Sequence, residues 1–115
     1  MAKYELSLTA DFKDFLVYLE DWVINANISA SLEDQSDYQN GEFHCAVRVF
    51  ERYSMIGENR LSLSIVLVGQ GDQLFLSGIT SGGSKGVLFK INTFGEEAYL
   101  EILKKAVKSY QKTQV

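Results

Sequence analysis

Three consecutive runs of alternating apolar and polar residues occupy the middle of the chain and constrain its fold more than any other feature. They are EFHCAVRVFERYS (42–54), RLSLSIVLVG (60–69) and QLFLSGIT (73–80). Strict alternation is typical of β-strands, whose successive side chains point to opposite faces of a sheet. Only the short turn sequences MIGEN and QGD separate the runs. Because a parallel connection needs a dozen or more residues, these strands are expected to pair antiparallel.

Two further strands are expected before this central block. Residues 2–8 and residues 28–34 also alternate between apolar and polar positions. Asn40-Gly41 is a strong tight-turn signal and predicts a hairpin that leads into the first central run. Around residues 86–91 the short apolar run VLFKI is compatible with one more strand or with a continuation across a bulge.

Two amphipathic helices flank the strands. Residues 11–27 carry one wide apolar stripe, and residues 93–112 carry another behind a capping box of Thr93 and Glu96. Both stripes need one sheet face to cover, so we expect a single α+β domain over residues 1–115, with both helices on one face of an antiparallel sheet. This order of a strand, a helix, four or five strands and a helix resembles the TATA-binding-protein-like arrangement and its helix-grip relatives. A fold alone implies no function.

Charge and cysteine content exclude several function classes. The formal net charge is −4, whereas a nucleic-acid-binding surface needs a basic excess to displace counterions from phosphates. The only cysteine, Cys45, can form no intramolecular disulfide, which favours a reducing compartment. Neither the apolar segment of a signal peptide nor an apolar run near the roughly 18 residues of a membrane span is present. We therefore expect a cytoplasmic protein with no nucleic-acid and no membrane partner.

The glycine-rich stretch GITSGGSKG (78–86) is similar in composition to phosphate-binding loops. A P-loop requires G-x-x-x-x-G-K-[ST] between a strand and a helix, so that loop amides and the helix N-terminus meet phosphate. Gly78 and Gly83 have that spacing, but Ser84 and Lys85 follow in reversed order. The next residues read as a strand. We interpret the stretch as a strand connection without a nucleotide cofactor, with a weaker anion-binding nest of amides as the alternative.

No set of catalytic or metal-binding residues can be assembled. His44 and Cys45 are adjacent, so on a strand they point to opposite faces and cannot act as a nucleophile and its base. One histidine supports neither a Ser-His site nor a histidine-based metal site. The acidic stretch EDQSDYQNGE (33–42) lacks the EF-hand order and reads as a solvated hairpin loop. We expect no catalytic residue, metal or cofactor, and an enzyme is the least favoured class.

The face of the sheet that the helices leave uncovered suggests a partner. If the helices cover the face bearing Val47 and Ile65, the buried set includes Cys45, which is then a small core hydrophobe. The outer face mixes apolar residues with two arginines, whereas a solvated face should be nearly all polar. We expect a homodimer, a ligand or another protein to cover it, the alternative being that arginine stems shield the apolar groups. The candidate interface residues are His44, Arg48, Phe50, Arg52, Val66 and Val68.

A carrier of a small apolar ligand is the second hypothesis. Helix-grip relatives hold ligands between the sheet and the helices, and large aromatic residues could line such a pocket here or simply fill the core. A carrier needs roughly 300 Å³ or more of concave space, which separates it from a packed core. The candidate pocket residues are Phe12, Phe15, Trp22 and Tyr99.

Three stretches also resemble an uncharacterised family of small bacterial proteins, a domain of unknown function. They are CAVRVFERYS, GDQLFLSGITSGGS and FKINTFGEEAYLE, and the resemblance spans nearly the whole chain. It implies a bacterial source and a cytoplasmic protein. It implies no activity.

Overall fold

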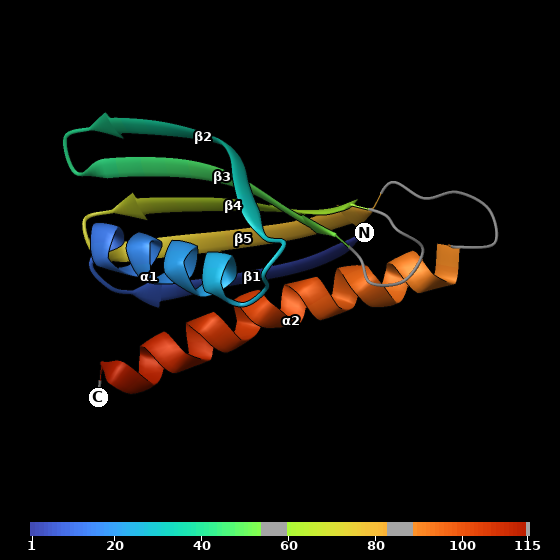
Figure 1. The fold of residues 1–115 in the computed structure, drawn as a ribbon. Coiled ribbons are helices and arrows are strands. Elements are labelled where there is room, and N and C mark those ends of the chain that lie inside the picture. Colours follow the sequence, from blue (N-terminus) through green and yellow to red (C-terminus); the bar gives the residue numbers. More distant parts are fainter. Residues whose placement is uncertain (54–59, 83–88, 115) are drawn as a thin grey trace.

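The computed structural model describes residues 1–53, 60–82 and 89–114, with the side chains of 89–94 excepted. Along the chain, the elements confirm the predicted α+β class and the order of a strand, a helix, four strands and a helix (Figure 1). They are β1 (Ala2–Thr9), α1 (Phe12–Asn25), β2 (Ser31–Asn40), β3 (Phe43–Tyr53), β4 (Arg60–Gln70), β5 (Gln73–Gly82) and α2 (Phe89–Thr113). Neither helix of the described residues is long and apolar enough to cross a membrane.

The strands form one antiparallel sheet in the order β1-β5-β4-β3-β2. Tight turns at Gly41 and Gly71 link β2 to β3 and β4 to β5, and both glycines have a φ of 60°, which favours glycine. The two turns touch, because the Gly71 amide donates to the Glu42 carbonyl at 3.0 Å. The predicted hairpin turn is confirmed, but it lies one residue later than the Asn40-Gly41 signal, since Asn40 still pairs with Phe43.

Strand β2 differs from the sequence prediction. Residues 28–30 lie before the strand, and most of the acidic stretch expected as a loop is instead the strand itself. Its pairing with β3 shifts register between Leu32 and Asp34. Backbone pairing at a sheet edge does not require apolar side chains, and charged residues on an edge strand discourage pairing with other chains. The polar composition of this stretch therefore reflects its edge position.

Helix α1 follows its predicted boundaries closely. Asp11 caps it, because its side chain accepts a hydrogen bond from the Asp14 amide at 2.9 Å. The apolar stripe packs into the core, where Phe15, Leu19 and Val23 have no exposed surface.

Helix α2 begins earlier than the capping box predicts. It starts at Phe89, so Thr93 lies inside the helix and the box is wrong. Phe89–Ile91 are helical, so the possible strand over 86–91 is also wrong for these residues, while 86–88 lie outside the described residues. A short apolar run has too few turns for its period to distinguish a strand from a helix.

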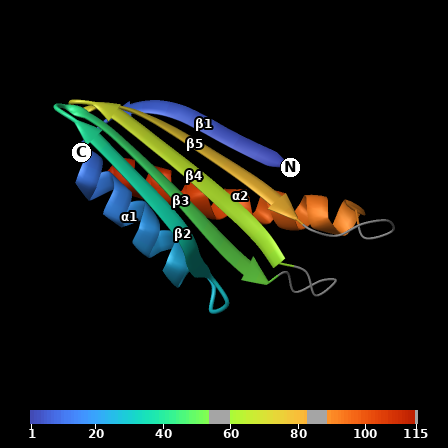
Figure 2. The same cartoon turned by 90° about the horizontal axis from the view of Figure 1, so that it is seen from above.

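Both helices lie on one face of the sheet, as predicted (Figure 2). Helix α2 contacts β5, β1 and β4 as well as α1, and the core fills the space between these layers. The helices also join through side chains, since the Tyr110 hydroxyl donates to Asp14 Oδ2 at 2.8 Å.

The β3–β4 register corrects the predicted assignment of sheet faces. Arg48 pairs with Ile65 and Phe50 pairs with Leu63, and residues directly opposite in an antiparallel pair share a face. The helix-covered face of β3 is therefore the one that bears Arg48 and Phe50. The prediction that Val47 shares a face with Ile65 is wrong, because both faces of β3 contain apolar residues and alternation alone does not set the register between two strands.

Candidate functional site

The sheet surface turned away from the helices, which we call the open face, has no covering layer among the described residues. Figure 2 looks onto it, with both helices beneath. Two of its large side chains, Phe75 and Ile79, are 38% and 40% exposed. From β3, β4 and β5 it presents apolar residues interleaved with serines, namely Phe43, Cys45, Val47, Val49, Val66, Val68, Phe75, Ile79, Ser62, Ser64, Ser77 and Ser81.

Charged residues on the open face lie at its margins. At one end, Arg60 and Glu51 form an ion pair of 2.7 Å. Within the described residues, the centre of the face has none, although a water-facing sheet is normally polar on that side. An apolar centre depleted of charge and a charged rim are the composition of a protein interface. One row across the five strands illustrates the pattern, and it consists of Lys3, Ile79, Ser64, Val49 and Asp34.

A hollow of about 320 Å³ lies on the open face close to the hairpin turns. Phe43 of β3 and Phe75 of β5 line it, and Val68 of β4 lies between their strands. Two strands separated by one other stand about 10 Å apart, which leaves room for an apolar side chain between the rings.

The six predicted interface residues do not share one face. Val66 and Val68 lie on the open face, whereas His44, Arg48, Phe50 and Arg52 lie on the helix-covered face. Phe50 is a core residue with no exposed surface. The sequence prediction therefore missed the other apolar members of the open face, Val47 and Val49 among them. Val47 and Val49 alternate in phase with Cys45, and this signal places all three on one face of β3. The sequence prediction takes that face to be the core.

Arg48 is held by a dense set of partners beneath the sheet. Its Nε donates to Glu20 Oε2 at 2.8 Å and its Nη2 to Asp37 Oδ1 at 2.9 Å, and its Nη1 donates to the Val47 carbonyl at 2.9 Å. The residue is only 6% exposed. Burial lowers the pKa of Arg48, but the hydrogen bonds and charges of Glu20 and Asp37 outweigh it and raise the pKa above its usual value. Arg48 thus ties edge strand β2 to helix α1.

Arg52 lies four residues further along the same face in a different environment. Its guanidinium carbon is 4.5 Å from the centroid of the Tyr99 ring, a cation–π arrangement. Tyr99 has no exposed surface. Among the described residues, neither Arg52 Nε nor the Tyr99 hydroxyl, both buried, has a hydrogen-bond partner.

The four predicted pocket residues are not brought together. Phe15 and Tyr99 are completely buried in the core. Phe12 stacks on His44 with ring centroids 4.9 Å apart and lines a groove of about 450 Å³ between α1, β2 and β3. Trp22 lines a separate hollow of about 630 Å³ along α1. Within the described part of the chain, these four residues therefore do not line a single pocket.

Cys45 is half-buried on the open face, so the prediction that it belongs to the buried core is wrong. It shares the open face with Val47 as expected, but that face is not the core. His44 lies on the helix-covered face, opposite Gly69 of β4. Among the described residues, no three histidine, cysteine or acidic side chains are grouped as a metal site would require.

The glycine-rich stretch falls partly outside the described residues. Gly78 belongs to β5, where an added Cβ would clash with the Leu103 side chain, so this glycine permits close packing of α2. Residues 83–86 lie outside the described part of the chain. The element that follows is α2, so the argument that a strand succeeds the stretch is wrong, while the reversed Ser84-Lys85 order is a property of the sequence.

Comparison with known proteins identifies the family. No curated protein matches the chain. A solution structure of Chr148 from Cytophaga hutchinsonii, a Northeast Structural Genomics Consortium target, is 14% identical, with 97% of this chain and 92% of that chain covered and a TM-score of 0.42. A family of unknown function, DUF6054, matches residues 1–111. The chain therefore belongs to DUF6054, as its resemblance to a domain of unknown function implied.

Proposed function

We propose that this protein is a non-enzymatic interaction protein that forms a symmetric homodimer through the open face. The observation that carries the proposal is the uncharged, apolar centre of a sheet face that no other element covers among the described residues. A second copy presents the same surface, and two-fold dimers are the commonest oligomers.

The size of the open face suits such a dimer. Five strands about 4.8 Å apart, each about ten residues of about 3.3 Å, span roughly 24 by 33 Å. That area is close to the roughly 800 Å² per partner that a stable interface buries. Two sheets packed face to face with nearly aligned strands form a sandwich with a common core.

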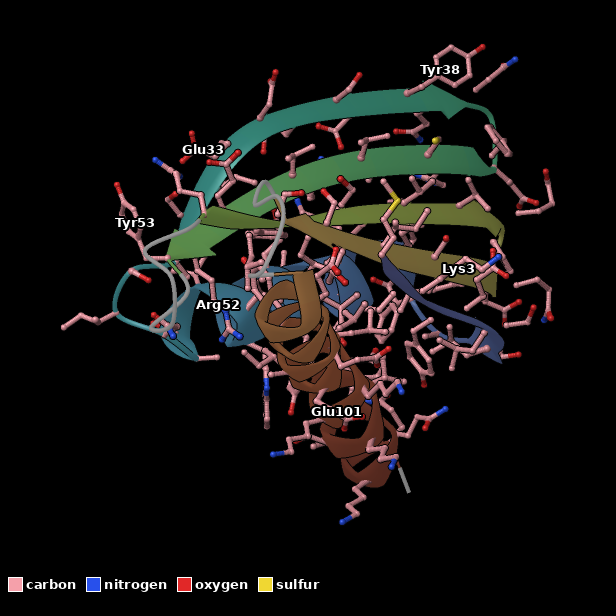
Figure 3. All side chains as sticks on the ribbon, turned by 90° about the vertical axis from the view of Figure 1, so that its right-hand side faces the viewer. Lys3, Glu33, Tyr38, Arg52, Tyr53 and Glu101 are labelled. Carbon is pink, nitrogen blue, oxygen red and sulfur yellow. The ribbon has the colours of Figure 1, made fainter. Side chains whose placement is uncertain are left out.

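Charge at the rim favours one orientation of the two sheets. A two-fold axis parallel to central strand β4 places β1 of one protomer over β2 of the other. Lys3 then faces the partner's Asp34, because both lie in the same cross-strand row, and Figure 3 shows Lys3 and Glu33 at opposite edges of the sheet. The same axis stacks Val66 and Val68 on the same residues of the partner.

The test is sedimentation of the wild-type chain and of Val66→Glu. At tens of micromolar, where even a micromolar dimer forms, we expect wild type at twice the monomer mass and Val66→Glu at the monomer mass. Val17→Glu is the matched control, because Val17 is 44% exposed on α1, on the other side of the molecule. It should stay dimeric.

A monomeric wild type would reject the dimer. So would a Val66→Glu variant that keeps both its circular dichroism and its dimer mass. An equal loss of association in Val17→Glu would show that the open face is not the contact.

A carrier of a small apolar ligand is the second candidate. The groove lined by Phe12, Leu16 and His44 measures about 450 Å³, within the range of small-molecule sites. This proposal relies on the TATA-binding-protein-like and helix-grip arrangement that the element order suggests. For either function we place the protein in the cytoplasm, because its one cysteine has no partner for an intramolecular disulfide.

A further inference from the structure

Arg52 carries a positive charge that the described residues do not neutralise. Two described acids, its strand neighbour Glu51 and Glu96 of α2, are engaged elsewhere. Glu51 points to the open face and pairs with Arg60 at 2.7 Å, and Glu96 of α2 pairs with the Met1 amino group at 3.2 Å. Within the described part of the chain, Arg52 forms no ion pair, in contrast to Arg48, which has two.

Arg52 Nε and the Tyr99 hydroxyl are buried hydrogen-bond donors for which the described residues provide no acceptor. Burial raises the pKa of Tyr99, so its hydroxyl is protonated at neutral pH and can donate. Burial lowers the pKa of Arg52, but arginine still keeps its proton and offers donors alone. Among the described residues, Arg52 Nε and the Tyr99 hydroxyl both remain without a partner. Buried donors without acceptors are rare in folded proteins and call for an explanation.

A water molecule could accept these hydrogen bonds, but it would leave the charge of Arg52 uncompensated. An oxyanion supplies both acceptors and a countercharge, and a guanidinium matches its oxygens with paired N–H groups. Arg52 retains some exposed surface, so the site can be reached from solvent. Figure 3 shows Arg52 beneath the sheet, on the side of the helices.

We propose that Arg52 and Tyr99 form a binding site for a compact oxyanion, the carboxylate or phosphate group of a small molecule. The site lies on the helix-covered face, so it is separate from the open face and does not depend on the dimer. Tyr99 orients the guanidinium through its ring and adds a hydroxyl donor to the anion.

The test is a titration of the protein with inorganic phosphate and, separately, with acetate at constant ionic strength, followed through the NMR signals of the Arg52 side chain. We expect saturable shifts with a dissociation constant of about 1 mM or tighter for at least one anion. Preference for phosphate assigns a phosphoryl ligand, and preference for acetate assigns a carboxylate.

Two variants and one control complete the experiment. Arg52→Gln should weaken binding at least about tenfold, and Tyr99→Phe, which keeps the ring, by about threefold, the range of one hydrogen bond. Arg60→Gln removes an equal charge from an arginine whose side chain is 46% exposed on the next strand, and it should bind as wild type does.

Thermal unfolding of Tyr99→Phe separates binding from folding. Loss of an unpartnered hydroxyl should leave the anion-free protein as stable as wild type or more stable, whereas phosphate or acetate should stabilise it less than wild type. Arg52 signals that do not respond to either anion, or equal affinity in Arg52→Gln and wild type, would overturn the proposal. If Arg52→Gln does not fold, unchanged affinity in Tyr99→Phe would overturn the role of Tyr99.

Discussion

The two faces of the sheet differ in where their charged residues lie, and the distribution is the reverse of the usual one, in which the covered face is apolar and the uncovered face is polar. The covered face contains two arginines among its apolar residues, Arg48 with only 6% of its surface exposed. The centre of the uncovered face, in the described part of the chain, contains no charged residue at all. Charge placed under the helices is costly unless it is paired, and absence of charge from a wet face is unusual. This difference is the basis for the proposal that a second copy of the chain covers the open face.

The largest expected difference in the free energy of unfolding is between variants of two neighbouring residues of β3, one on each face of the sheet. Phe50→Glu places a charge in the core, and we expect it to cost about 4 kcal/mol or more, which is most of the stability of a small domain. Val49→Glu places the same charge on the open face, and the free energy of unfolding of the monomer should change by about 1 kcal/mol at most. Urea unfolding at concentrations below dimerisation measures both.

Equal destabilisation by these two variants would contradict the face assignment. Strong destabilisation by Val49→Glu together with a stable Phe50→Glu would mean that the helices cover the other face.

A smaller effect is expected from removal of the paired arginine. Arg48→Met keeps most of the volume but leaves Glu20 and Asp37 without their cation, and we expect a loss of about 3 kcal/mol in urea unfolding. Arg52→Met is the matched control and should cost less than about 1 kcal/mol, since it removes a half-buried charge that has no ion-pair partner among the described residues. A loss for Arg52→Met as large as for Arg48→Met would show that both arginines are structural.

The sequence predicted the element types well and the face assignment badly. Alternation and turn glycines located β1, β3, β4 and β5, because each of these signals is local. The register between β3 and β4 is not local, and both phases of β3 contain apolar residues, Phe50 in one and Val49 in the other. The arginines were therefore assigned to the wrong face.

The partners of the buried polar groups were beyond sequence reasoning for the same reason. Glu20 reaches Arg48 from a helix 28 residues away, at 2.8 Å. Tyr99 meets Arg52 from α2, at the other end of the chain. Such pairs depend on how the layers pack, which no local pattern encodes. The polar side chains of the acidic stretch gave no strand signal, so it was predicted as a loop. Its backbone pairing with β3 makes most of it strand β2.

Labelling of Cys45 with a thiol reagent measures directly whether two open faces cover one another. It is the only cysteine of the chain, and it lies half-buried on the open face, between Phe43 and Val47 on the same side of β3. If two open faces cover one another, the labelling rate of the wild type should fall as protein concentration rises through the dimer dissociation constant. In Val66→Glu the rate should stay high at every concentration. A wild-type rate that is as fast as that of Val66→Glu and independent of concentration would show that the open face is not covered by a second copy.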